Sequence, residues 1–133
     1  MFTKDDIIFS YTRAQAIADG VLYAVPDGIR KEAGFRVPVA LSERAYRDCV
    51  EWTEADTERH QVVQDQEGRL WDVLAMARFA AIGKPASSRI EFDLLRVPRQ
   101  GSGHTARRVR LVSMIHEGDA GEPVITTMFP DED

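Results

Sequence analysis

Arginine, histidine and threonine side chains recur in the last third of the chain, where their chemistry suits contact with phosphate. Guanidinium groups bind phosphate through paired hydrogen bonds, and a histidine among them can act as a general acid or base in RNA cleavage. If this region forms alternating strands, one side of the sheet would carry Arg96, Arg108, Arg110, His116 and either Thr126 or Thr127. The candidate catalytic residues are therefore His116, Arg108, Arg110 and Thr126.

The same region holds most of the positive charge that could bind a partner. Residues 89–110 carry a net charge of +4, whereas residues 42–67 carry −5 and residues 117–133 carry −6, within a total of −5. The basic band therefore lies between two acidic regions, and it either pairs with the chain's own acidic tail or faces an anionic partner. The candidate binding residues are Arg96, Arg99, Arg107, Arg108 and Arg110.

Other chemical groups are spaced in ways that favour structural roles. His60, His104 and His116 lack the short spacings of metal ligands, so we expect no metal site. Cys49 is the single cysteine and lies at helical spacing from Tyr46, which favours a buried packing role over a nucleophile. The glycines around Ser102 form neither a phosphate loop nor a dinucleotide motif, so we expect no cofactor.

The elements that position these groups begin with Ile7–Val25, which predicts a strand, a short helix and a second strand. Thr12 and Gln15 form a capping box for a helix from about Arg13 to Asp19, with Ala14, Ile17 and Ala18 on its inner side. Gly20 ends that helix in the left-handed conformation. Val21–Val25 then runs as a strand up to a turn at Pro26-Asp27-Gly28.

Two helices are expected in the middle of the chain. Residues 28–41 precede these helices and show no strong helical pattern. Pro38 indicates an edge strand or an extended loop in this segment. Ser42 caps the first helix, which packs Ala45 and Cys49 inward and frays somewhere between Trp52 and Arg59, and His60–Gln66 is a loop or short ribbon. The second helix runs from about Arg69 to Ala81, and its apolar stripe, flanked by Trp71 and Phe79, is expected to be buried against a sheet: Leu70, Val73, Leu74 and Ala77.

The last third predicts a three-stranded antiparallel meander. Apolar residues alternate with polar ones along 90–95, 109–115 and 124–129, and glycine-rich turns separate these runs. The 69–81 helix is the natural cover for the apolar face. We therefore expect an α+β fold, with residues 1–130 as a single globular domain and 131–133 as an acidic tail.

Composition restricts the cellular setting. The lone cysteine indicates a reducing compartment, and no apolar run has the length of a membrane span or a signal peptide. We expect a cytoplasmic protein with no membrane partner, whose composition is compatible with a homo-oligomer.

Two resemblances bear on function. The opening unit is similar to the start of mono-ADP-ribosyltransferases, but Phe9-Ser10-Tyr11-Thr12 lacks the histidine that their first strand carries. Five stretches resemble a family of small uncharacterised proteins encoded on bacterial plasmids and other mobile elements: SYTRAQAIADGVL, DCVEWTEAD, GRLWDVLAMA, RVPRQG and EGDAGEPVITTMFP. That resemblance implies an accessory protein of a mobile element, one that modulates host defence, conjugation or plasmid upkeep.

The leading hypothesis is therefore a non-enzymatic binding or accessory protein with a protein or nucleic-acid partner. Its rival is a phosphate-contacting enzyme such as a small toxin-like ribonuclease, and an ADP-ribosyltransferase-like domain is a weaker alternative. A third hypothesis is that residues 43–58 and the acidic tail mimic nucleic acid towards a host nuclease, although −5 is a mild net charge for a mimic.

Overall fold

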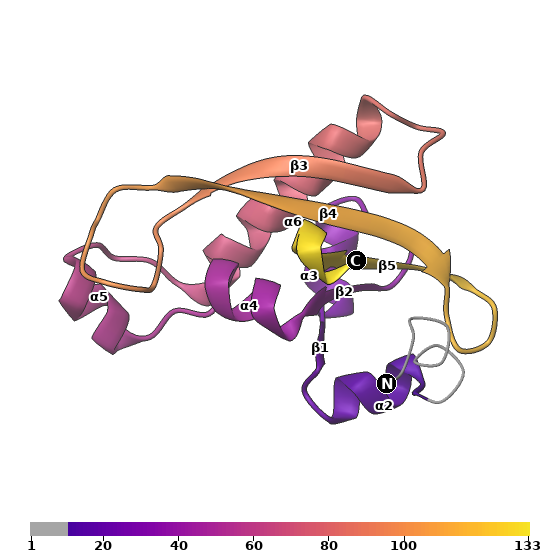
Figure 1. Cartoon of the computed structure of the whole chain (residues 1–133), viewed down its shortest axis with the longest axis horizontal. Helices are drawn as coiled ribbons and strands as arrows, with labels where there is room; N and C mark the ends of the chain where they lie inside the picture. Colours follow the sequence, from indigo (N-terminus) through magenta and orange to yellow (C-terminus); the bar gives the residue numbers. More distant parts are fainter. Residues whose placement is uncertain (1–10) are drawn as a thin grey trace.

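A five-stranded mixed sheet forms the centre of the computed structural model, which describes residues 11–133 (Figure 1). The strand order is β1 (Leu22–Ala24), β2 (Val39–Ser42), β5 (Pro123–Met128), β4 (Arg107–Glu117) and β3 (Arg89–Arg96). β2 pairs with β5 in parallel, and every other neighbouring pair is antiparallel. The α+β class and the three-stranded C-terminal meander are confirmed. The strand expected at Val21–Val25 is β1, and together with β2 it extends the same sheet.

The helix α6 (Gln66–Ile82) packs against β3 and covers one face of the meander. Leu70, Val73, Leu74 and Ala77 are buried in the main core together with Leu111 of β4, so the expected stripe is confirmed. The helix begins three residues earlier than expected because Asp65 caps it by accepting from the Gly68 amide. Phe79 differs from the expectation: the sequence placed it beside the buried stripe, but its side chain is 75% exposed. Among residues 11–133, no helix has the length and apolar character to span a bilayer.

The N-terminal unit has the expected local signals but a different buried face. Thr12 and Gln15 form the capping box of α2 (Arg13–Ala18), and Gly20 follows it with a φ of 77°. The buried residue is Ala16, whereas Ala14, Ile17 and Ala18, which the sequence placed on the inner side, are exposed. The expected strand at 7–9 lies outside the described residues.

Replacing Thr12 with alanine should lower the free energy of unfolding by about 1 kcal/mol, because the backbone amide of Gln15 loses its acceptor, the Thr12 hydroxyl, at the start of α2. Urea denaturation followed by circular dichroism measures the change. Thr12→Ser keeps the acceptor and should stay near wild type, and equal losses in both variants would refute the capping argument.

Residues 26–42 contain more regular secondary structure than expected. The predicted turn at Pro26-Asp27-Gly28 is instead the start of α3 (Asp27–Glu32), in which Asp27 accepts from Arg30. The predicted edge strand or loop is β2, which is buried throughout and lies between β1 and β5. Pro38 is tolerated because it precedes the strand, where its carbonyl accepts from the Ile125 amide at 2.9 Å.

The expected helix after Ser42 is two helices. Ser42 caps α4 (Glu43–Cys49), with Ala45 and Cys49 buried as predicted. The chain then breaks and restarts as α5 (Glu54–His60), because Thr53 and Asp56 form a second capping box. His60, which the sequence placed in a polar loop, is the last residue of α5 and is fully buried.

Candidate functional site

Four arginine side chains line a groove between α4 and the end of β3. The groove has a volume of about 670 Å³. Arg96 and Arg99 come from the predicted basic band, and Arg44 and Arg47 come from α4. The remaining lining residues are Glu43, Asp48, Gln100 and Phe129. We call this feature the arginine groove.

Arg96 and Arg99 form its fixed wall. Arg96 Nε donates to Asp48 Oδ2 at 2.9 Å, and its side chain is only 14% exposed. Arg99 donates to Glu51 Oε1 and to Asp56 Oδ2, which joins the segment after β3 to the helical region 43–60. Burial lowers the pKa of Arg99, but the hydrogen bonds to Asp56 and Glu51 outweigh it and raise that pKa overall. Carboxylates of the helical region therefore hold both arginines in a fixed orientation.

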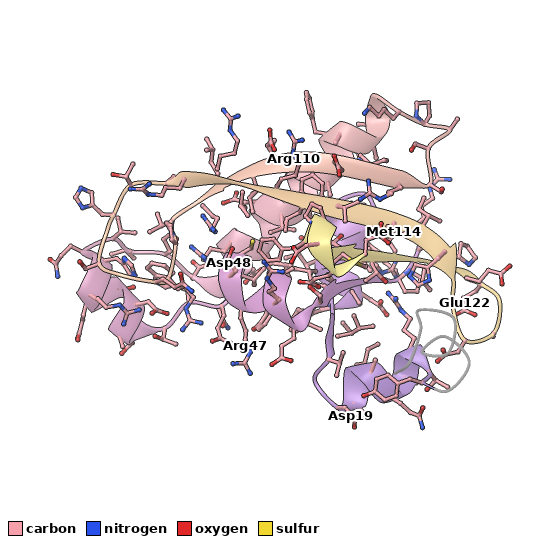
Figure 2. All side chains as sticks on the ribbon, in the orientation of Figure 1. Asp19, Arg47, Asp48, Arg110, Met114 and Glu122 are labelled. Atoms are coloured by element: carbon pink, nitrogen blue, oxygen red, sulfur yellow. The ribbon has the colours of Figure 1, made fainter. Side chains whose placement is uncertain are left out.

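Arg44 and Arg47 form the accessible wall, with side chains that are 55% and 65% exposed. Arg44 donates to Asp131 Oδ2 at 2.6 Å and lies 4.2 Å from the centre of the Phe129 ring. Arg47 pairs with Glu43 at 3.0 Å within the same helix. Figure 2 shows Arg47 and Asp48 at α4, with Arg110 across the sheet in the same view. Exposed ion pairs of this kind contribute little stability, so another anion can replace either carboxylate.

The other arginines predicted for binding lie away from this groove. Arg107 is opposite Arg96 in the β3–β4 register, yet it does not line the groove. Arg108 and Arg110 point to the opposite face of the sheet, because side chains alternate along a strand. Arg110 Nε donates to Asp93 Oδ1 at 3.0 Å, and this hydrogen bond lowers the pKa of Asp93. The structure therefore divides the predicted band between two faces.

The predicted catalytic residues lie on the same face of the sheet, but they are spread along the strands and do not form one cluster. Arg108, Arg110 and His116 alternate along β4, and Thr126 lies opposite Met114 on the same face. His116 is six residues from Arg110, which is about 20 Å at the rise of a strand. Arg96 and Thr127 belong to the other face. Only His116 and Thr126 are therefore brought into contact.

His116 and Thr126 meet in a network that includes Arg13, a residue that sequence reasoning missed. Thr126 Oγ1 accepts from Arg13 Nη1 at 2.7 Å and lies 2.7 Å from His116 Nε2. If the hydroxyl donates to Nε2, the other ring nitrogen donates to the Glu117 carbonyl at 3.1 Å. Burial lowers the pKa of Arg13, although Asp119 opposes this shift. Nothing in the sequence around Arg13 pointed to this contact, which forms between the two ends of the chain.

Asp119 holds the start of α2 beside that network. Its carboxylate accepts from the backbone amides of Arg13 at 2.8 Å and Ala14 at 3.0 Å, and these hydrogen bonds lower the pKa of Asp119. The turn between β4 and β5 therefore anchors the start of α2. Thr126 is 5% exposed, so its hydroxyl is enclosed by the groups that it contacts.

The helix α5 contacts the loop between β3 and β4 through its last residues. The ring nitrogens of His60 face the carbonyl oxygens of Gly103 and Arg99, and Arg59 donates to the Gly101 and Arg99 carbonyls. Asp56 accepts from both Arg59 and Arg99. We call these contacts the loop clasp. It holds the backbone that carries Arg99, one of the residues that line the groove.

Cys49 is unsuited to nucleophilic chemistry, as predicted. It is 1% exposed, and burial is the main cause that raises the pKa of its thiol to about 12, with Asp48 adding to the effect. The reactive thiolate is therefore scarce at neutral pH.

One family model matches residues 1–133, and its description is "Family of unknown function (DUF6573)". The chain belongs to the DUF6573 family. No curated protein and no solved structure matches this DUF6573 chain.

Proposed function

We propose that this DUF6573 protein is a non-enzymatic binding protein whose arginine groove holds an anionic group of a partner. The observation that carries the proposal is the pair of accessible arginines, Arg44 and Arg47, opposite the fixed pair Arg96 and Arg99 in one groove. Guanidinium groups bind carboxylate or phosphate through paired hydrogen bonds. A wall that is already held in place reduces the entropy lost on binding.

The resemblance of five sequence stretches supports a cellular setting for this role. We propose that residues 1–130 act as one globular domain in the bacterial cytoplasm, in an accessory protein of a plasmid or other mobile element. Modulation of host defence or plasmid upkeep would fit a protein that binds a host component. The lone buried cysteine agrees with a reducing compartment.

Substituting both accessible arginines tests the proposal. The double variant Arg44→Gln and Arg47→Gln should bind a short acidic peptide or a short single-stranded RNA about tenfold more weakly than wild type, which corresponds to about 1.4 kcal/mol. Fluorescence anisotropy with labelled probes measures the affinity, and raised salt should weaken it further.

A second double variant controls for net charge. Arg36→Gln and Arg78→Gln remove two exposed arginines outside the groove, and they should leave the affinity unchanged. If wild type binds neither probe, or if both double variants lose affinity equally, the arginine groove is not the binding site.

The contact between His116 and Thr126 favours one rival function, a phosphate-contacting enzyme. An imidazole beside a hydroxyl and a guanidinium is a combination that can act on phosphate esters. Purified protein should be incubated with total RNA and with a fluorescent NAD analogue. A binding protein leaves both unchanged, and RNA cleavage that is lost in Thr126→Val would favour the enzyme instead.

A further inference from the structure

The chain returns to the arginine groove after its last strand. Phe129 follows β5 and lines the groove, and the 3-10 turn η1 (Pro130–Glu132) then brings carboxylates to arginines of two other elements. Asp131 lies 2.6 Å from Arg44 of α4, and Asp133 lies 2.8 Å from Arg89 of β3. We call residues 131–133 the acidic segment.

We infer that the acidic segment, through the contact of Asp131 with Arg44, takes the position that a carboxylate of a partner's acidic peptide occupies at this arginine of the groove, and that the partner must displace it to bind. This inference rests on the proposed function and adds the class of partner and a means of control. The observation that carries it is the contact between the side-chain carboxylate of Asp131 and Arg44. Arg44 is one of the two residues that the proposed function requires to be accessible.

The floor of the groove explains how the exchange can occur without disturbing the core. Phe129 is 9% exposed and belongs to the main hydrophobic core, so its ring stays in place under the Arg44 guanidinium. A cation over an aromatic face remains attractive whichever anion it pairs with. The movable part is Asp131, whose side chain is 69% exposed. Arg44 can therefore release the Asp131 carboxylate and pair with a carboxylate of the partner while it stays over the Phe129 ring.

The small number of basic side chains in the groove favours an acidic peptide over a nucleic acid. The protein has a net charge of −5, and half of the eight groove residues are arginines, with Glu43 and Asp48 beside them. Such a site lacks the broad basic surface that attracts a phosphate backbone. It matches a few carboxylates, for which the acidic segment is the example within the chain.

Tethering makes the acidic segment an effective competitor even though each of its ion pairs is weak. A group held on the same chain acts at a high effective concentration, so it occupies its site whenever no stronger ligand is present. Hydrogen bonding to Arg44 lowers the pKa of Asp131, so this contact favours the charged form of the carboxylate. Removing its charge should therefore expose Arg44 to a partner.

The experiment compares the affinity of a fluorescein-labelled peptide of alternating aspartate and glutamate for three proteins. Asp131→Asn with Glu132→Gln should bind the peptide about three- to fivefold more tightly than wild type, the range expected when an exposed ion pair no longer competes. Glu54→Gln with Glu58→Gln changes the net charge equally at exposed positions of α5 and should match wild type. Thermal melting shows that all three are folded.

The outcomes separate the inference from the proposed function. Equal affinity in wild type and the Asp131 variant would overturn the competitor role and leave the binding function intact. If all three proteins bind a labelled single-stranded RNA more tightly than the peptide, the peptide class is overturned and the partner is a nucleic acid. Absence of binding to either probe by all three proteins would overturn both proposals.

Discussion

Replacing His60 with leucine is expected to lower the free energy of unfolding by about 3 kcal/mol, the largest loss among the substitutions considered for this chain. His60 is fully buried, and its ring nitrogens face the Gly103 and Arg99 carbonyls. Arg99 O would keep a second donor, Arg59 Nη2 at 3.0 Å, whereas the Gly103 carbonyl would lose its partner. Leucine also gives up the tilted ring contact with Trp52, whose centre lies 5.3 Å away.

Urea denaturation measures this loss, and limited trypsin digestion identifies its location. Cleavage after Arg99 or Arg107 should become faster in the variant, because the loop clasp holds the segment between them. His104→Leu makes the same change at an exposed histidine of the same loop and should cost less than about 0.5 kcal/mol. Equal losses at both positions would contradict the clasp.

Replacing Asp56 with asparagine is expected to cost about 2 kcal/mol at neutral pH. Its carboxylate is buried and accepts from the Thr53 backbone and hydroxyl, Arg59 and Arg99. Burial by itself raises the pKa of Asp56, but these hydrogen bonds prevail and lower it to about 2. Asparagine leaves the two guanidinium groups facing a neutral amide, and the 44% exposure of Arg59 keeps the cost moderate.

The pH dependence of that loss follows from the direction of the shift. A lowered carboxyl pKa stabilises the folded state fully above the unfolded pKa of 3.8, and this stabilisation disappears as the pH falls from 3.8 through about 2. Wild type and Asp56→Asn should therefore differ at pH 7 and converge near pH 2 in urea titrations. Glu54→Gln, in the same helix but exposed, should match wild type at both pH values, and a constant gap between wild type and Asp56→Asn would reject this account.

The parts of the fold that depend on neighbouring residues were predictable. Thr12 and Ser42 cap their helices, Gly20 adopts a positive φ, and the apolar stripe of α6 is buried, because each signal acts within a turn or two of helix. The position of β2 was not predictable in this way. Its burial depends on pairing with β5, far along the chain, and Pro38 made the segment resemble an edge.

The residues of the candidate site also divide into those that the sequence indicates and those that only the folded structure reveals. Arg96 and Arg99 were named because they belong to a basic band that can be counted from the sequence. Arg44 and Arg47 were not named, because they lie in a region whose net charge of −5 hides them. Only the packing of α4 beside the end of β3 brings the two pairs together. Asp56 and His60 were missed because the second capping box and the loop clasp depend on a break in the expected helix.

The parallel pairing of β2 with β5 also constrains how the chain folds. Val39 lies opposite Ile125, so the centre of the sheet joins an early part of the chain to a late one. The loop-closure entropy of this long-range contact must be overcome before the contact becomes stabilising, which slows folding. On the ribosome, β2 has no partner on that side until the residues of β5 have emerged. Stable folding of the sheet should therefore wait until synthesis has passed β5.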